Sequence, residues 1–235
     1  MPSAQPSESP APRGEPLPGL LIAGASGLVG RELVRLASAD TAWHPLHLVA
    51  RRALPVPQGS QLIVAAFDRL PPLPPAASAC CALGTTLATA GSREAFRAVD
   101  FDAVLAFARA ARAAGVRRLA VVSALGADPR SRNFYNRVKG EAEAALDELG
   151  FETLILARPS LLSGDRASLA QAPRRGEGLA LTLTRPLSGL IPMAWRPIEA
   201  STVARALLRA LRDRGPGRHV LESAALQASG ILPRR

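Results

Sequence analysis

The chain has 235 residues, of which 48% are hydrophobic; this length and composition suit one folded domain and exclude a mainly disordered protein. Its net charge of +10 does not predict a nucleic-acid partner, because the basic residues are spread along the sequence and no basic stripe is interleaved with aromatic residues. No apolar run is long enough to cross a bilayer, so we expect no membrane span.

The opening segment, 1–18, is rich in Pro, Ser and Glu. Such a composition favours a disordered leader. The segment also lacks the apolar centre of a signal peptide, and we therefore expect a cytoplasmic protein.

Short apolar runs recur along the first part of the chain. The run 19–24 ends in glycine and is typical of a buried parallel strand. The segment 25–40 that follows has the apolar spacing of an amphipathic helix. Three further strands are predicted at 46–50, 61–67 and 78–84.

Two adjacent cysteines, Cys80 and Cys81, fall within the fourth predicted strand. Neighbouring cysteines rarely form a disulfide because the geometry is strained, so we expect buried strand residues, with a redox or metal role as the alternative. The three histidines have no cysteine or carboxylate at metal-ligand spacing, and we predict no metal site.

The rest of the chain alternates between helices and strands. A helix is predicted around 100–116, with Asp100 or Asp102 near its start and Gly115 as its stop. The stretch FYNRVKGEAEAAL opens another helix, which Gly150 closes. The remaining predicted elements are strands at 117–126, 151–160 and 218–223 and a late helix at 199–211.

This alternation predicts one α/β domain. Strand–helix–strand units with right-handed crossovers build a doubly wound parallel sheet with helices on both faces, the Rossmann fold. We expect the domain to cover 19–222 and to be followed by a C-terminal tail, 223–235.

Three glycines, Gly24, Gly27 and Gly30, lie between the first strand and the first helix. In a dinucleotide site the first glycine permits the tight turn, the second lets the backbone approach a pyrophosphate, and the third brings the helix close to the sheet. The N–H groups at the start of the helix then face the phosphates. The context predicts a dinucleotide site, and a glycine-rich turn without a ligand is the alternative.

The residues after the second and third strands point to the cofactor. Arg51 and Arg52 follow the second strand, where an acidic residue would favour NAD. Two guanidinium groups suit the 2′-phosphate of NADP, and two solvated surface arginines are the alternative. Asp68, after the third strand, is a candidate acceptor for the adenine amino group or an ordinary loop residue.

The only tyrosine of the chain, Tyr135, precedes its only lysine, Lys139, by four positions. Residues at this spacing share one face of a helix. An ammonium close to a phenol stabilises the phenolate, which makes the phenol a usable general acid or base. Ser123, where the fifth strand ends, is placed to donate a hydrogen bond to a substrate carbonyl; a serine that satisfies a strand-end backbone group is the alternative.

Together these residues resemble the atypical branch of the short-chain dehydrogenase/reductase superfamily, in particular the group that contains the Tat-interacting protein and its bacterial relatives. The resemblance covers about residues 19 to 222 and is carried by LIAGASGLVGREL, VARR, CALGTT, AGSREAF..VD, VVSALGAD, FYNRVKGEAE, ARPSLL and GDR. It implies that the catalytic residues are Ser123, Tyr135 and Lys139. It also implies that NADP is held by Gly24, Ser26, Gly27, Leu28, Val29, Arg51 and Arg52, is flanked by Leu83, Gly84 and Thr85, and has its nicotinamide near Pro159 and Ser160.

Superfamily members often carry an asparagine on the helix after the fourth strand as part of a proton relay. No asparagine of this chain can be placed there, since Asn133 and Asn136 both flank Tyr135.

We therefore predict an NADPH-dependent reductase that transfers hydride to a small carbonyl-type acceptor. A regulatory protein that binds NADPH and a protein partner without turnover is the alternative. We expect 161–198 to form a lid over the substrate. The residues that mark this lid are Arg166, Arg174, Arg175, Arg185 and Trp195. The sequence predicts no particular oligomeric state.

Overall fold

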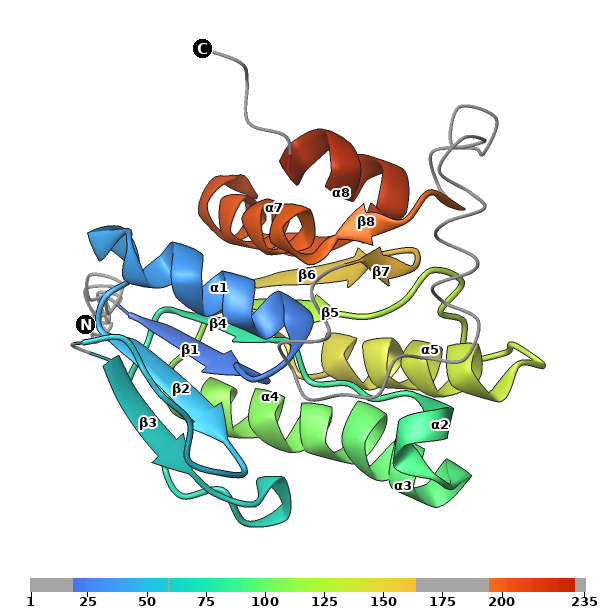
Figure 1. The fold of residues 1–235 in the computed structure, drawn as a ribbon, viewed down its shortest axis with the longest axis horizontal. Helices are drawn as coiled ribbons and strands as arrows, with labels where there is room; N and C mark the ends of the chain where they lie inside the picture. Colours follow the sequence, from blue (N-terminus) through green and yellow to red (C-terminus); the bar gives the residue numbers. More distant parts are fainter. Residues whose placement is uncertain (1–18, 59, 164–194, 231–235) are drawn as a thin grey trace, which may run out of the picture.

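Seven strands form one parallel sheet in the order β3-β2-β1-β4-β5-β6-β9 (Figure 1). The computed structural model describes residues 19–58, 60–163 and 195–230. The strands are β1 (Leu20–Ala23), β2 (Leu46–Ala50), β3 (Ser60–Val64), β4 (Ser78–Cys81), β5 (Arg118–Val122), β6 (Thr153–Arg158) and β9 (Gly217–Glu222). Two short strands, β7 (Leu162–Ser163) and β8 (Ile198–Glu199), pair beside this sheet.

The central strands are buried on both faces. Every residue of β1, β2 and β4 is buried, which explains why these strands are continuous apolar runs rather than alternating ones. The chain moves outward from β1 to β2 and β3, and then returns to place β4 on the other side of β1. The carboxyl ends of β1 and β4 therefore form the switch point at which ligands bind in doubly wound sheets.

Helices cover both faces of the sheet (Figure 1). One layer contains α1 (Leu28–Ser38), α7 (Ala200–Asp213) and α8 (Ser223–Gly230). The opposite layer contains α3 (Arg93–Arg97), the π-helical segment η3 (Ala98–Ala103), α4 (Val104–Ala113) and α5 (Phe134–Asp147). Short connecting elements are η1 (Thr41–Trp43), η2 (Phe67–Arg69) and α2 (Leu87–Ala90). The predicted α/β doubly wound parallel sheet is confirmed.

The helix after β4 begins earlier than the sequence suggests. We expected Asp100 or Asp102 near its start, but helical structure already begins at Arg93, where the Ser92 side chain accepts the N–H of Ala95 at 3.0 Å. Ser92 takes the capping role that an aspartate was expected to fill. Asp100 instead lies inside the π-helical segment and is only 1% exposed.

The end of the domain also differs from the expectation. The segment 223–235 was expected to be a tail, but its described part, 223–230, forms α8, and Leu226 on this helix is fully buried in the core. The expected leader over 1–18 and the four arginines assigned to the lid lie outside the described residues. Trp195 is described, and 68% of its surface is exposed.

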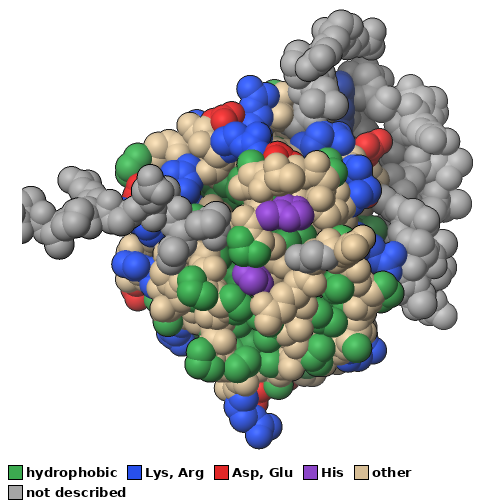
Figure 2. All heavy atoms as spheres, turned by 90° about the vertical axis from the view of Figure 1, so that its left-hand side faces the viewer, with side chains coloured by type: hydrophobic (Ala, Val, Ile, Leu, Met, Phe, Trp, Pro, Cys, Tyr) green, Lys and Arg blue, Asp and Glu red, His purple; other side chains and the backbone are tan. Residues whose placement is uncertain are grey.

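Figure 2 shows the side of the molecule at the left of Figure 1, from which the arrow of β1 points away. Basic side chains lie mainly around the edge of this face, and hydrophobic side chains are mixed with others across its centre. Among the helices of the described ranges, none has the length and apolar character needed to cross a membrane.

Candidate active site

The glycine loop lies tightly against the neighbouring strand. Gly24 has a φ of +83°, and a Cβ at this position would lie 2.5 Å from the carbonyl carbon and oxygen of Ala82, so only glycine is accommodated. The N–H of Gly27 donates to the Gly24 carbonyl at 3.0 Å and closes the turn. A Cβ on Gly30 would overlap the Gly24 carbonyl, so this glycine lets α1 approach the loop.

The start of α1 offers donors to an anion. Its N-cap is Gly27, which supplies no side-chain hydrogen bond, and its first turn contains no acidic residue. The first N–H groups of a helix have no partner within the helix and carry partial positive charge. Ser26, just before the cap, is exposed, and Leu28 and Val29 form the first turn. This arrangement fits the pyrophosphate of a dinucleotide.

The residues expected to choose between NAD and NADP lie at the outer part of this crevice. Arg51 and Arg52 directly follow β2, and both are exposed. Asp68, in η2 after β3, is also exposed, and its carboxylate lies 3.6 Å from the guanidinium of the adjacent Arg69. The two arginines can therefore turn toward a ligand at the carboxyl end of β2.

Lys139 is buried and paired with an acidic residue. Its Nζ lies 2.8 Å from Oδ1 of Asp100, and 6% and 0% of the two side chains are exposed. The other oxygen of Asp100 accepts the N–H of Thr85 at 2.8 Å. Burial alone would lower the pKa of Lys139, but the electrostatic interactions with Asp100 and then with Tyr135 outweigh it, so the pKa is raised and the ammonium stays charged.

Asp100 is the site residue that the sequence analysis missed. It lies on the helix after β4, where no relay asparagine could be assigned, and the π-helical turn carries it inward to Lys139. π-Helical turns inside helices are frequent at functional sites. The signal was present in the VD pair at the end of the stretch AGSREAF..VD, but Asp100 was assigned to a helix start.

Tyr135 lies at the wall of an open pocket. It is in the first turn of α5, whose N-cap Asn133 accepts the N–H of Asn136. Its ring packs against Phe96, with ring centroids 5.2 Å apart. The pocket, of about 390 Å³, lies where β5 and β6 end and is lined in part by Ser123, Tyr135, Pro159 and Ser160.

The loop after β4 completes the inner side of the crevice. A Cβ on Gly84 would lie 3.3 Å from Asp100 and 3.6 Å from the Lys139 ammonium, so this loop runs directly over the ion pair. Leu83 and Thr85, on either side, are half-buried. The structure thus brings the loop after β4, Lys139 and Asp100 together, while Arg51 and Arg52 remain at the outer part.

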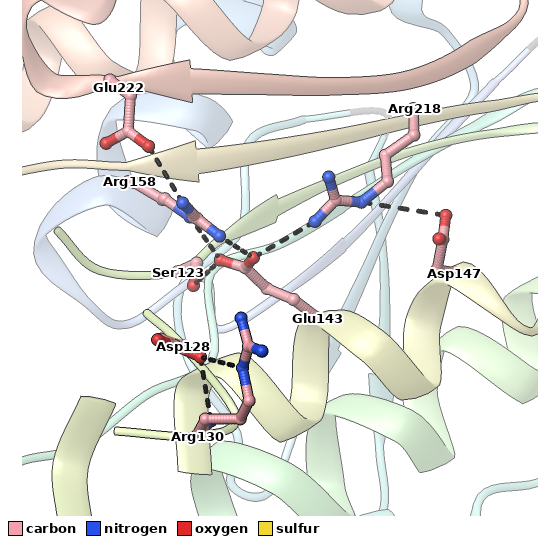
Figure 3. A network of polar contacts seen from close by, with 8 residues as sticks. All are labelled: Ser123, Asp128, Arg130, Glu143, Asp147, Arg158, Arg218 and Glu222. Atoms are coloured by element: carbon pink, nitrogen blue, oxygen red, sulfur yellow. Dashed lines mark hydrogen bonds and ion pairs between the residues drawn. The ribbon is translucent and has the colours of Figure 1, made fainter. Parts of the chain in front are cut away.

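Ser123 lines the pocket, but its hydroxyl hydrogen is already donated to another residue of the protein (Figure 3). Its hydroxyl donates to Oε1 of Glu143 at 2.5 Å. Glu143 is 3% exposed and also accepts from Nε and Nη2 of Arg158 at 3.0 and 2.6 Å. Donation from Ser123 to a substrate carbonyl, its predicted role, requires exchange of the bond to Glu143.

Arg158 joins Glu143 to the edge of the sheet (Figure 3). Its third contact is with Glu222 on β9 at 3.0 Å, and Arg218 on the same strand lies 3.5 Å from Glu143. Hydrogen bonding to Glu143 is the main cause that raises the pKa of Arg158. The network holds a charged carboxylate behind Ser123, and since a carboxylate only accepts hydrogen bonds, Ser123 is the donor.

The two cysteines of β4 are buried and form no disulfide. Burial raises the pKa of the Cys81 thiol to about 12, which keeps it protonated at neutral pH. The prediction that Cys80 and Cys81 are buried strand residues is confirmed. Within the described ranges, His, Cys, Asp and Glu side chains form no group of three or more suited to a metal ion.

The fold, the glycine loop and the paired lysine define a protein of the dinucleotide-binding, short-chain dehydrogenase/reductase type. Residues 24–214 match the model of a family described as NAD(P)H-binding. The chain belongs to this NAD(P)H-binding family, among the atypical short-chain dehydrogenases/reductases, as the resemblance of its motifs predicted.

Two relatives illustrate this membership. Protein HTATIP2 of Rattus norvegicus is 34% identical over 219 residues, which cover 88% of this chain and 87% of that protein. The mitochondrial protein FMP52 of Eremothecium gossypii is 35% identical over 150 residues, which cover 62% of this chain and 67% of that protein.

Solved structures share the fold at low sequence identity. A structure of MoeE5 in complex with UDP-glucose and NAD has a TM-score of 0.65 at 20% identity and covers 86% of this chain and 75% of its own. UDP-glucose 4-epimerase of Thermotoga maritima has a TM-score of 0.63 at 13% identity, with 86% and 75% of the two chains covered. These similarities support the fold alone.

Proposed function

We propose that this protein is an NADPH-dependent reductase that reduces a small carbonyl compound to an alcohol. The observation that carries the proposal is the position of Tyr135 at the pocket wall, one helical turn before the buried ammonium of Lys139. A phenol beside a fixed positive charge is a suitable proton donor for an oxygen that becomes negative during reduction.

The residues divide the chemistry between them. When bound, NADPH supplies a hydride for the carbonyl carbon. Tyr135 gives its phenolic hydrogen to the carbonyl oxygen, so that the product is a neutral alcohol, and the phenolate later regains a proton from solvent. Lys139 stabilises the phenolate and would hold the nicotinamide ribose when the cofactor is bound. Asp100 keeps the ammonium charged and oriented, as a positioning residue.

NADP rather than NAD is favoured by the two guanidinium groups after β2. No acidic residue occupies the end of this strand, where a carboxylate would accept from the 2′-hydroxyl of NAD. Arg51 and Arg52 are exposed and can form charge-assisted hydrogen bonds with a 2′-phosphate.

The arginines can be tested by cofactor titration. Replacing both Arg51 and Arg52 with alanine should weaken NADPH binding by roughly 10- to 100-fold and leave NADH binding nearly unchanged. Arg209→Ala on α7, which removes an exposed guanidinium outside the cofactor crevice, is the matched control. An equal loss of affinity for NADPH and for NADH would contradict the assignment of these arginines to the 2′-phosphate.

Turnover is tested by NADPH oxidation with a panel of aldehydes, ketones and quinones. Tyr135→Phe keeps the ring against Phe96 and removes only the hydroxyl. The proposal expects unchanged cofactor affinity and a loss of kcat of at least roughly 100-fold. Tight NADPH binding without oxidation by either form would instead favour the alternative, a cofactor-binding regulatory protein. The cytoplasmic location remains a prediction, and the FMP52 relatives are named as mitochondrial proteins.

A further inference from the structure

The pocket beside Tyr135 is mostly apolar. It has a volume of about 390 Å³, within the range of roughly 300–1,000 Å³ that is usual for small-molecule sites. Nine described residues line it; six of them are apolar, three carry a hydroxyl group, and none of these nine is charged. The apolar residues are Ala124, Leu125, Pro159, Leu161, Leu162 and Trp195.

Two of the three hydroxyl groups have already donated their hydrogen within the protein. Ser123 donates to Glu143. Ser160 donates to the carbonyl of Arg196 and accepts from Ser223 at 3.0 Å. Each hydroxyl has a single hydrogen, so these two serines present lone pairs to a ligand and no donor.

Two backbone N–H groups of the pocket lining are also occupied. The N–H of Ser123 donates to the Ala157 carbonyl at 2.7 Å, and the N–H of Leu125 donates to the Pro159 carbonyl at 3.0 Å. Among the hydroxyl groups of the described lining, that of Tyr135 is therefore the one with no hydrogen bond within the described part of the protein; the indole N–H of the exposed Trp195 is the other side-chain donor of the lining.

We infer that this pocket takes a neutral, mainly apolar carbonyl compound whose reacting oxygen accepts a hydrogen bond from Tyr135. This inference rests on the proposed reductase function and specifies its substrate class. An apolar wall favours apolar groups, whereas a carboxylate or phosphate would lose its hydration without gaining a cation from the described lining. The carboxylate of Glu143, behind Ser123, is 3% exposed and held by Arg158, so it does not recruit a cationic substrate either.

This substrate class differs from that of the nucleotide-sugar complexes that share the fold. The structures compared above contain UDP-glucose or are named for it. A sugar diphosphate carries two charged phosphates, and among the described residues that line this pocket none is a cation that could receive them.

Ligand binding can be measured without turnover through Trp195. The chain has two tryptophans: Trp43 is 8% exposed, while Trp195 is 68% exposed and lines the pocket. Titration of the NADP⁺-loaded protein with acetophenone should therefore change the emission of Trp195, and Trp195→Phe should remove that change. Acetophenone should bind at least roughly tenfold more tightly than 4-acetylbenzoate, which differs by one carboxylate.

A charge placed in the pocket should reverse this preference. Leu161 is 37% exposed, so Leu161→Arg introduces a guanidinium at the pocket without disturbing the core. The variant should gain roughly tenfold in affinity for 4-acetylbenzoate relative to acetophenone. Val64→Arg, at a 52% exposed position on the edge strand β3, adds the same charge elsewhere and should leave the ratio unchanged.

The outcomes separate this inference from the proposed function. If acetophenone binds and shifts Trp195 emission but NADPH is not oxidised with any compound of the panel, the preference of the pocket for neutral apolar ligands stands and the reductase proposal fails. If NADPH is oxidised with 4-acetylbenzoate in preference to acetophenone, the reductase proposal stands and the inferred substrate class is overturned. Equal binding of the two probes, or binding of neither at millimolar concentration, also overturns it.

Discussion

Replacing Asp100 with asparagine should reveal how strongly the buried ion pair stabilises the fold. The two side chains are 6% and 0% exposed, and the ammonium of Lys139 lies 2.8 Å from the carboxylate. Asparagine has nearly the same shape as aspartate and can still accept the hydrogen bond from the N–H of Thr85, so the variant removes the charge but almost no side-chain volume. It leaves a buried ammonium without its counter-ion, which lowers the free energy of unfolding by about 3–5 kcal/mol.

A double-mutant cycle isolates the interaction. Lys139→Met alone leaves a buried carboxylate and should be destabilising by a similar amount. The double variant, with Asp100→Asn and Lys139→Met, buries no charge at these positions and should be clearly more stable than the sum of the single effects predicts. The free energies are measured by urea unfolding with a fixed m value. Additivity within about 0.5 kcal/mol would refute the coupling.

The pH dependence of the free energy of unfolding gives an independent check that the Asp100–Lys139 ion pair is stabilising. In the native protein the pKa of Lys139 is raised above its ordinary value of 10.5, so its stabilising contribution is fully present below that value and is lost as the pH rises through the folded-state pKa. In Asp100→Asn, burial becomes the main influence and lowers this pKa. The variant should therefore gain stability relative to the native protein as the pH rises from neutral towards 10. Parallel stability curves would contradict this.

Three further predictions concern other parts of the molecule. Gly30→Ala places a methyl group against the glycine loop and should lower the free energy of unfolding by about 1–3 kcal/mol, whereas Gly215→Ala, with open space around its Cβ, should stay within about 0.5 kcal/mol in the same urea titration. The buried thiols of β4 should react with a thiol reagent only after denaturant is added, and rapid labelling of the native protein would contradict their burial. Glu143→Gln should destabilise by about 1–3 kcal/mol, because Arg158 loses its buried acceptor, while Glu222→Gln at the half-exposed end of the same network should change stability by less than about 1 kcal/mol in thermal unfolding.

The buried strands and the glycine loop could be predicted from sequence because their signals are local. The strand predicted at 46–50 matches β2 residue for residue, since a strand covered on both faces is an uninterrupted apolar run. The glycine spacing likewise follows from one turn between one strand and one helix. Gly24 and Gly30 are required by contacts that lie within or beside that turn.

The polar contacts of the site could not be predicted, because they join distant segments. Asp100 meets Lys139 only after β4 and β5 pair and bring their following helices together. An aspartate near a helical pattern is ordinarily an N-cap, and no local feature of the sequence distinguishes such a cap from an aspartate buried in an ion pair. Glu143 and Arg158 are polar residues on a helix and a strand, and their engagement with Ser123 depends on the order of the sheet.

The single lysine of the chain is explained by its place on α5. Tyr135, Lys139 and Glu143 follow one another at intervals of four, so they form one row on the face of the helix directed at the sheet. Each has a different partner: the first faces the pocket, the second reaches Asp100, and the third receives Ser123. Beside this row lie the buried apolar residues that dock the helix, namely Val138, Ala142 and Leu146. A compact ammonium fits the narrow space beneath the Gly84 loop better than the broader fork of an arginine, which accounts for one lysine here in a sequence whose other Lys and Arg positions are all arginine.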